Sequence, residues 1–225
     1  MIEFVFLDID DTLLDFSWAE CQGIHRAYAE LGLLLTEEMY LRYHVVNQQW
    51  WQAYERGEIS REGLLVARHR QMFEEYGLSA DAEALERAYR RNLGIGHKFL
   101  PHAEALLAYL RPKYRLYVAS NGVGETQYSR LESAGLTDFF DGVFISEELG
   151  AYKPMPEFFE RSFAQIPGFR RERAILLGDS LSSDILGGRN AGLRTIWCNL
   201  RRQPPRADIR ADYEVHDLRE VMEIL

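Results

Sequence analysis

Short runs of consecutive apolar residues alternate with segments of helical periodicity along most of this 225-residue chain. Such apolar runs are typical of strands that are buried on both faces of a sheet. The pattern predicts five strands: Glu3–Leu7, Leu116–Ala119, Val143–Ile145, Ala174–Leu177 and Thr195–Cys198. Helix-like segments lie between the later runs, at Glu125–Ala134, Pro156–Ala164 and Asp184–Ala191. This alternation predicts an α/β fold with a Rossmann-like parallel sheet flanked by helices.

The section from about Ser17 to Asn92 interrupts the alternation, because it contains no strand-like run, and residues 93–96 that follow it suit a return hinge. It reads as three or four amphipathic helices, and two of them begin at Thr36 and Ser60, each followed by acidic residues in the first helical turn. The sequence therefore predicts a core domain made of residues 1–16 and 97–225. A helical cap domain is inserted between these two parts.

Polar clusters follow four of the five predicted strands. The clusters are Asp8-Ile9-Asp10-Asp11, Ser120-Asn121-Gly122, Ser146-Glu147-Glu148 and Gly178-Asp179-Ser180. The carboxyl ends of parallel strands meet at one edge of a sheet, and ligands bind there. We therefore expect these clusters to contribute to one site.

The carboxylates of these clusters indicate a metal site. Asp8 and Asp10 are two residues apart, so a regular strand would present both on one face. Carboxylates this close repel each other unless a cation, a proton or hydrogen bonds compensate. Mg²⁺ prefers oxygen ligands and could provide this compensation. Asp179 and Asp184 add carboxylates at another strand end. Asp184 taken alone is more typical of a cap before a helix, but the whole set of acids at two strand ends favours a metal site.

A lysine and a polar turn complete the candidate chemistry. Lys153 precedes a proline, and a lysine near several carboxylates would balance their charge as a compact cation. Ser120, Asn121 and Gly122 offer a hydroxyl, an amide and backbone N–H groups, which suit phosphate oxygens. A simple helix cap is the alternative interpretation of this turn.

Taken together, the segments that contain Asp8, Ser120, Lys153 and Asp179 resemble the four motifs of the haloacid dehalogenase superfamily. The resemblance covers essentially the whole chain. The positions that match are Asp8 as nucleophile, Asp10 as acid/base, Ser120 in the second motif, Lys153 in the third, and Asp179 with Asp184 in the fourth. Four motifs in this order, each near a predicted strand end, make the resemblance specific.

This resemblance implies a Mg²⁺-dependent phosphatase that forms an aspartyl-phosphate. Asp8, Asp179 and the backbone carbonyl of Asp10 would bind the metal, and Asp184 would orient neighbouring groups. Lys153 would be catalytic through its position beside Asp8. The groups expected to bind phosphate are Asp11, Ser120, Asn121, Gly122 and Lys153. The dehalogenases of the superfamily do not use an aspartate at position 10, so Asp10 favours phosphoryl transfer.

Within the superfamily, the chain most resembles the noncanonical pyrimidine nucleotide phosphatases, a 5′-nucleotidase group. The segments that carry this resemblance are Val143–Gly150, Lys153-Pro154, Ser183–Leu193, Val46-Asn47, Trp50-Trp51 and Gly57–Ser60. It implies a pyrimidine nucleoside 5′-monophosphate as substrate. Asn47, Trp50 and Trp51 could contact the base, but the helical spacing of Trp50 and Trp51 from Tyr54 favours packing within the cap.

Two other interpretations stay open. The first is a phosphoglycolate or sugar-phosphate phosphatase, or a phosphomutase, of the same superfamily. The second is a receiver-like signalling module, which also combines a phospho-accepting aspartate, a lysine and an acidic cluster at strand ends. Asp10 and the large helical insertion argue against the receiver.

The net charge and the amino-acid composition limit the kinds of partner that this protein could bind. The net charge of −9 argues against a nucleic-acid polymer, because proteins that bind polyanions usually carry a basic face. The sequence has no apolar run that could span a membrane and no recognisable signal peptide, and its two cysteines lack metal-ligand spacing. We therefore expect a cytoplasmic enzyme acting on a small phosphorylated metabolite, and the sequence leaves the oligomeric state open.

Overall fold

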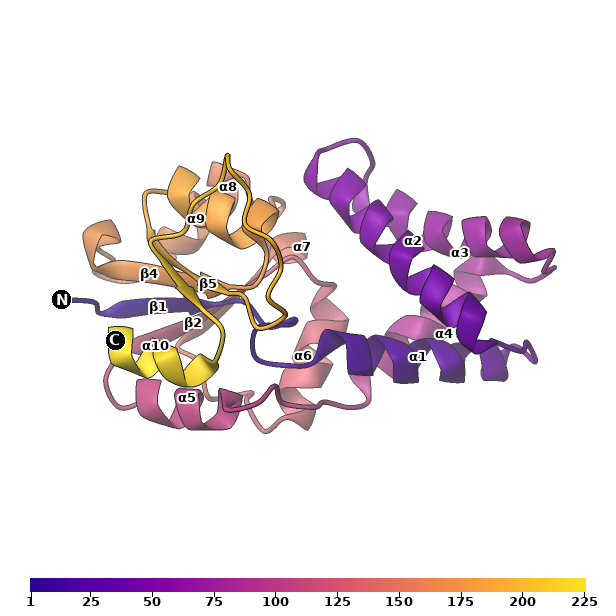
Figure 1. Ribbon diagram of the computed structural model, residues 1–225, viewed down its shortest axis with the longest axis horizontal. Coiled ribbons are helices and arrows are strands. Elements are labelled where there is room, and N and C mark those ends of the chain that lie inside the picture. The colour runs from indigo at the N-terminus through magenta and orange to yellow at the C-terminus, as the bar shows by residue number, and fades with distance from the viewer. The chain divides into compact units, whose positions relative to one another are not determined.

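The computed structural model describes residues 1–225 and divides into two compact units (Figure 1). The core unit comprises Met1–Phe16 and His97–Leu225, and the helical unit comprises Ser17–Gly96. The helical unit contains most of α1 (Phe16–Glu30) together with α2 (Glu37–Glu55), α3 (Arg61–Tyr76) and α4 (Ala82–Gly94).

The core unit contains six strands with helices between most of them. The strands are β1 (Phe4–Leu7), β2 (Arg115–Ser120), β3 (Gly142–Ile145), β4 (Ala174–Gly178), β5 (Arg194–Cys198) and β6 (Tyr213–Val215). The α-helices are α5 (Ala103–Leu110), α6 (Gly124–Ser133), α7 (Ser146–Leu149), α8 (Pro156–Phe163), α9 (Leu186–Asn190) and α10 (Leu218–Ile224). Two short segments, η1 (Arg171–Arg173) and η2 (Leu181–Ile185), have 3₁₀ and π geometry.

The six strands form one sheet in the order β3-β2-β1-β4-β5-β6, and every pair of neighbours is parallel. This arrangement confirms the predicted α/β fold, and all five predicted strands are present. The strand β6 was not predicted from the sequence; it has three residues, of which Tyr213 and Glu214 are exposed. A strand with one buried side chain leaves no apolar run to detect.

The central strand β1 is buried on both faces of the sheet. Phe4 and Phe6 pack in one apolar cluster with side chains of α8, and Val5 and Leu7 pack in another with side chains of α5 and α10. Figure 1 shows these helices in layers on opposite sides of the sheet. Because successive side chains of a strand point to opposite faces, a strand between two helical layers must be apolar at every position.

The four helices of the helical unit fit the three or four that the sequence predicts. Thr36 Oγ1 accepts a hydrogen bond from the Met39 N–H at 3.2 Å, and Ser60 Oγ accepts one from the Gly63 N–H at 3.1 Å. Both residues therefore cap the N-termini of helices, as predicted.

The interior of the helical unit holds a chain of buried polar side chains. Asn47 Nδ2 donates to Glu20 Oε1 at 2.6 Å, and Asn47 Oδ1 accepts from Arg68 Nη1 at 2.7 Å. Arg68 Nη2 donates to Glu86 Oε2 at 2.6 Å, and His69 Nε2 lies 2.8 Å from the same oxygen. These side chains come from all four helices, so the hydrogen bonds between them tie the helices together. Removing one partner from such a buried ion pair typically costs about 3–5 kcal/mol.

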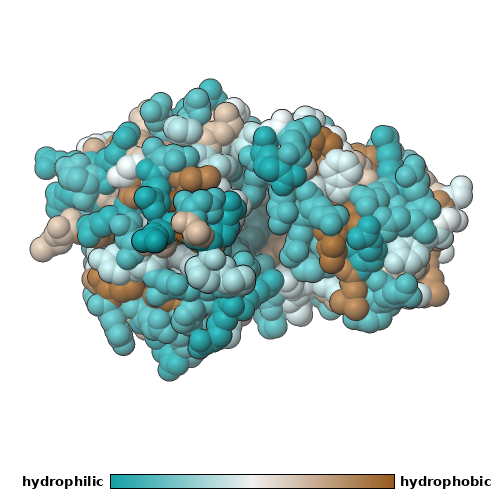
Figure 2. Space-filling view, turned by 45° about the horizontal axis from the view of Figure 1, so that its top comes forward, coloured by the Kyte–Doolittle hydropathy of each residue, from teal (hydrophilic) through white to brown (hydrophobic).

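The surface in Figure 2 is predominantly hydrophilic, and its apolar residues form small, separate patches. The most exposed large apolar side chains of the helical unit include Leu34 and Leu41. None of the helices combines the length and the apolar character that are needed to cross a lipid bilayer.

We predict that acid destabilises the helical unit through His69. Burial lowers the pKa of His69 to about 4, and its Nδ1 atom has no hydrogen-bond partner. An unfolded histidine titrates at about 6.5, so below this pH the unfolded chain binds a proton that the folded chain does not. Stability should therefore fall as the pH drops from about 6.5 towards 4, by at most about 1.4 kcal/mol per pH unit from this residue.

Thermal unfolding of the wild type and of His69→Gln between pH 5 and pH 8 tests this prediction. Glutamine keeps a neutral N–H donor for Glu86 but cannot be protonated, so the variant should lose stability less steeply in acid. Equal pH dependence in both proteins would contradict the role of His69.

Candidate active site

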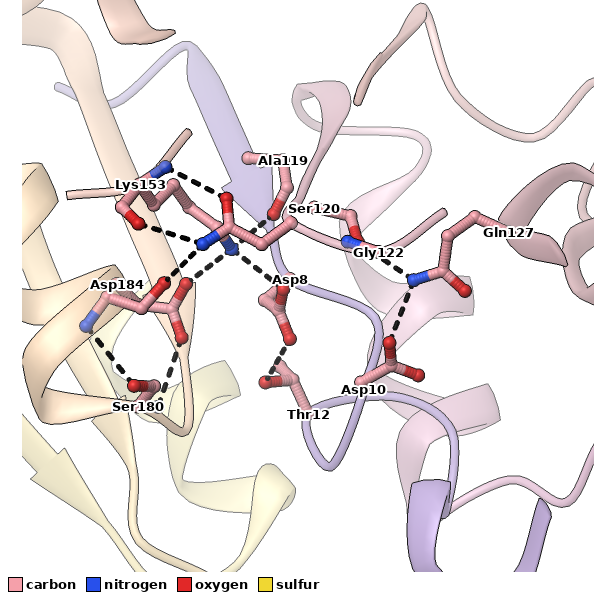
Figure 3. Close-up of polar contacts among 12 residues, drawn as sticks. Asp8, Asp10, Thr12, Ala119, Ser120, Gly122, Gln127, Lys153, Ser180 and Asp184 are labelled. Atoms are coloured by element: carbon pink, nitrogen blue, oxygen red, sulfur yellow. Dashed lines mark hydrogen bonds and ion pairs between the residues drawn. The ribbon is translucent and has the colours of Figure 1, made fainter. Parts of the chain in front are cut away.

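Asp8 lies directly after the central strand β1 and is 7% exposed. Its Oδ1 atom accepts a hydrogen bond from Lys153 Nζ at 2.7 Å, and its Oδ2 atom lies 3.4 Å from the Thr12 hydroxyl (Figure 3). Burial raises the pKa of Asp8 to about 7, although Lys153 opposes this shift. The carboxylate is thus held in one orientation at the edge of the sheet.

Lys153 is 1% exposed, and its ammonium group contacts three groups at this edge. Nζ donates to Asp8 Oδ1 at 2.7 Å, to the Ala119 carbonyl at 2.6 Å and to Asp184 Oδ1 at 2.6 Å. Burial alone would lower the pKa of Lys153, but Asp184 and Asp8 together raise it above its ordinary value. All three N–H donors are engaged, so a phosphoryl oxygen would have to replace one of these partners.

Asp184 is 1% exposed, and both of its carboxylate oxygens are bonded. Its Oδ2 accepts from the Ser180 N–H at 3.0 Å, while its Oδ1 faces Lys153. The carboxylate lies over Gly178, where a Cβ atom would come within 2.2 Å of Asp184 Cγ. The absence of a side chain at position 178 is therefore what allows Asp184 to reach Lys153.

Three carboxylates form a cluster that fits a divalent cation. Asp8, Asp179 and Asp184 each offer an oxygen within 4.8 Å of the other two. Burial, reinforced by the neighbouring Asp184 and Asp8, raises the pKa of Asp179 well above its ordinary value. Trp197 Nε1 donates to the backbone carbonyl of Asp179 at 2.8 Å and so holds this residue in place. The concentration of buried negative charge and the all-oxygen donor set match what Mg²⁺ prefers.

Asp10 is held by a different set of partners from Asp8. Because β1 ends at Leu7 and the chain then turns, the expectation of one regular strand face for both aspartates was wrong. Asp10 Oδ2 accepts from Gln127 Nε2 at 2.8 Å, and its Oδ1 pairs with the guanidinium of Arg130. The two carboxylates are therefore in chemically different surroundings.

Asp11 adopts a positive φ of 56°, which lets the chain turn after β1. Its N–H donates to the Leu14 carbonyl at 2.8 Å, and its carboxylate accepts from Arg201 at 2.8 Å and from the Phe16 N–H at 3.1 Å. Burial raises the pKa of Asp11 to about 6, although Arg201 opposes the rise. These contacts stabilise the turn itself, and the phosphate-binding role of Asp11 stays a prediction.

The polar turn after β2 contributes mainly to positioning. Asn121 Nδ2 donates to the Lys153 carbonyl at 2.8 Å, and Asn121 Oδ1 accepts from the Lys153 N–H at 2.8 Å. This pair of bonds fixes the backbone of the lysine and engages both ends of the Asn121 side-chain amide, while the phosphate-binding role of Asn121 stays a prediction. The Gly122 N–H donates to Ser120 Oγ at 3.0 Å. The Ser120 hydroxyl hydrogen is suited to donate to a phosphoryl oxygen.

The three residues predicted to contact the substrate base all lie on α2 of the helical unit. Asn47 is 1% exposed and bonded at both ends of its amide to Glu20 and Arg68, so burial removes it from this set. Trp50 and Trp51 are partly exposed. Trp50 Nε1 donates to Gln71 Oε1 at 2.9 Å.

Gln127 and Arg130 contact Asp10 from α6, and neither was predicted from the sequence. Both lie on a helix that the sequence predicts, one turn apart, and both are 1% exposed. Polar residues on an amphipathic helix are usually exposed to solvent, so nothing in the pattern predicts their burial. The tertiary structure alone brings this face of α6 to Asp10, which is more than 100 residues earlier in the chain.

Known proteins with similar sequences identify the family. The sequence model of the haloacid dehalogenase-like hydrolase family matches residues 2–192. The chain belongs to this family. The family and its relatives support the predicted class of enzyme, a phosphoric monoester hydrolase.

Three relatives cover nearly the whole chain. The HAD-hydrolase YfnB of Bacillus subtilis (strain 168) is 39% identical over 221 residues, which is 98% of this chain and 94% of YfnB. A crystal structure of YfnB bound to magnesium matches with a TM-score of 0.95, covering 100% of this chain and 98% of that one. The pyrimidine 5′-nucleotidase PynA of Streptococcus pneumoniae (strain ATCC BAA-255 / R6) is 35% identical over 99% of this chain and 94% of PynA. The pyrimidine 5′-nucleotidase YjjG of Escherichia coli (strain K12) is 32% identical over 99% of this chain and 97% of YjjG.

We predict that Gly178→Ala destabilises this hydrolase by about 1–3 kcal/mol, because the new methyl group must displace Asp184. Chemical denaturation measures the loss. Gly96→Ala is a suitable control, since a Cβ at position 96 comes no closer than 3.4 Å to the Trp18 side chain. Unchanged stability of Gly178→Ala, with Asp184 still bonded to Lys153 in a crystal structure, would contradict this account.

Proposed function

We propose that this hydrolase is a Mg²⁺-dependent phosphatase that acts on a pyrimidine nucleoside 5′-monophosphate through an aspartyl-phosphate at Asp8. The observation that carries the proposal is the difference in burial and in bonding partners between two neighbouring carboxylates. Asp8 is buried against Lys153, whereas the side chain of Asp10 is 28% exposed and held by groups on α6. Such a difference in surroundings is typical of a site in which one carboxylate is the nucleophile and the other the acid/base.

The first chemical step forms the phospho-enzyme. A carboxylate oxygen of Asp8 attacks phosphorus in line, and the bond from phosphorus to the leaving oxygen breaks. Asp10, in its protonated form, transfers a proton to that leaving oxygen. Lys153 contacts the attacking carboxylate, and Ser120 is suited to donate to a phosphoryl oxygen.

The second step releases phosphate. Asp10, now a carboxylate, takes a proton from water as the water oxygen attacks phosphorus. The bond between phosphorus and Asp8 breaks, which restores both carboxylates to their starting states. This step separates a phosphatase from a receiver-like module, in which no group is placed to activate water.

The carboxylate cluster supports the proposed use of Mg²⁺. Asp8, Asp179 and the backbone carbonyl of Asp10 would hold the ion, with Asp184 beside them. When bound, Mg²⁺ would neutralise negative charge on the phosphoryl group and on the attacking carboxylate.

The nucleotide substrate is supported by similarity to PynA and YjjG, which span nearly the whole chain including the helical unit. We propose that the helical unit is a cap that selects the substrate. Trp50 and Trp51 are its candidate base contacts, because both are partly exposed and their flat apolar faces could stack on a pyrimidine.

We predict that phosphate release from p-nitrophenyl phosphate requires Asp8 and a divalent ion. Asp8→Asn should lower kcat by at least about 1,000-fold, because the amide is a poor nucleophile, and it should leave the fold intact. EDTA should abolish activity, and added Mg²⁺ should restore it. Asp15→Asn is a matched control, since Asp15 pairs with Lys98 through a 2.8 Å contact outside the carboxylate cluster. Substantial activity in Asp8→Asn would contradict the mechanism.

We predict that pyrimidine nucleoside monophosphates are the preferred substrates in a panel that also contains sugar phosphates and phosphoglycolate. Their kcat/KM should exceed that of the other compounds by at least about 10-fold, and Trp50→Ala or Trp51→Ala should reduce this preference. A panel in which no pyrimidine nucleotide ranks above the sugar phosphates would exclude the proposed substrate while leaving the phosphatase chemistry intact.

A further inference from the structure

Gln127 and Arg130 lie one turn apart on α6, and both direct polar atoms at Asp10. Each is 1% exposed, whereas the side chain of Asp10 is 28% exposed. The carboxylate thus lies at the surface of the site, with two buried partners behind it.

The Gln127 amide connects Asp10 to the phosphate-binding turn. One Nε2 hydrogen is directed to Asp10 Oδ2 at 2.8 Å and the other to Ser120 Oγ at 2.8 Å, as Figure 3 shows. Ser120 Oγ also accepts from the Gly122 N–H, so both of its lone pairs are engaged. The serine hydroxyl must therefore direct its own hydrogen elsewhere, and one amide sets the orientation of both groups.

Arg130 fixes the other half of Asp10. Its Nη1 atom pairs with Asp10 Oδ1 and donates to Gln127 Oε1 at 3.1 Å, while Nε and Nη2 are buried without a hydrogen-bond partner. Burying a guanidinium with two unpaired nitrogens is costly. With one partner on each oxygen, the Asp10 carboxylate cannot rotate freely, yet each oxygen keeps a lone pair for proton transfer.

Gly122 provides the space that this arrangement needs. A Cβ atom at position 122 would come within 2.6 Å of Gln127 Nε2 and 2.7 Å of its Cγ and Cδ atoms. Any larger residue would therefore displace the amide from Asp10 and Ser120. Position 122 of the polar turn therefore requires glycine for a steric reason that is independent of phosphate binding.

We propose that Gln127 and Arg130 are positioning residues that hold Asp10 where it can protonate the leaving oxygen and that couple this orientation to Ser120. The inference rests on the proposed function, because it gives Asp10 the role of general acid. It predicts that losing either residue impairs the reaction in proportion to how much the leaving group needs a proton.

Two substrates with different leaving groups test this. The 5′-oxygen of uridine monophosphate needs protonation to leave, whereas p-nitrophenolate leaves without it. Arg130→Met and Gln127→Met should each lower kcat/KM for uridine monophosphate at least about 10-fold more than kcat/KM for p-nitrophenyl phosphate. In an Asp10→Asn background, neither substitution should change the ratio of the two values further, because both residues act through Asp10.

Arg111→Met is the control, since Arg111 pairs with Asp141 in the same unit and contacts no group of the site. The ratio of kcat/KM for uridine monophosphate to kcat/KM for p-nitrophenyl phosphate should be the same in this variant as in the wild type. Thermal unfolding identifies a variant that does not fold. If either Arg130→Met or Gln127→Met fails to fold, the other of these two variants tests the inference. Equal losses for both substrates, or full additivity with Asp10→Asn, would overturn the inference. A wild-type protein that hydrolyses neither substrate would instead overturn the proposed function.

Discussion

The ammonium group of Lys153 is the interaction on which the site depends. It is buried, and it joins three strand ends by donating to Asp8 after β1, to the Ala119 carbonyl in β2 and to Asp184 after β4. Without this cation, two buried carboxylates would face each other unpaired, at a cost of several kcal/mol. Gly178 and Asn121 serve the same contact, the first by making room for Asp184 and the second by fixing the lysine backbone.

The second constraint on the site is that Asp8 and Asp10 have different bonding partners. The backbone turn after β1 directs the two carboxylates to different partners, which come from the loops around Lys153 in one case and from α6 in the other. A parallel sheet brings these elements together because the carboxyl ends of its strands share one edge. The proposed nucleophile and acid/base can thus lie two residues apart in sequence and still occupy different surroundings.

The strands that position the site could be predicted from sequence because burial on both faces leaves an uninterrupted apolar run, as in β1. The motifs were equally visible, because Asp8, Lys153 and Asp179 follow or lie between those runs. The detailed roles were not. Asn47 was expected at the substrate, but Glu20 and Arg68 bury it, and the partners come from other helices. Gln127 and Arg130 were missed for the same reason, since only the tertiary structure places a polar helix face against Asp10.

The identity of the phosphorylated residue directly tests whether Asp8 is the nucleophile. The enzyme would be mixed with substrate, quenched within one turnover and reduced with borohydride, which converts an aspartyl-phosphate to homoserine. Peptide mass spectrometry then locates the change. Homoserine is expected at position 8 and not at position 10, with no conversion in a sample that lacks substrate. Modification at another residue, or turnover with no trapped intermediate at position 8, would contradict this role of Asp8.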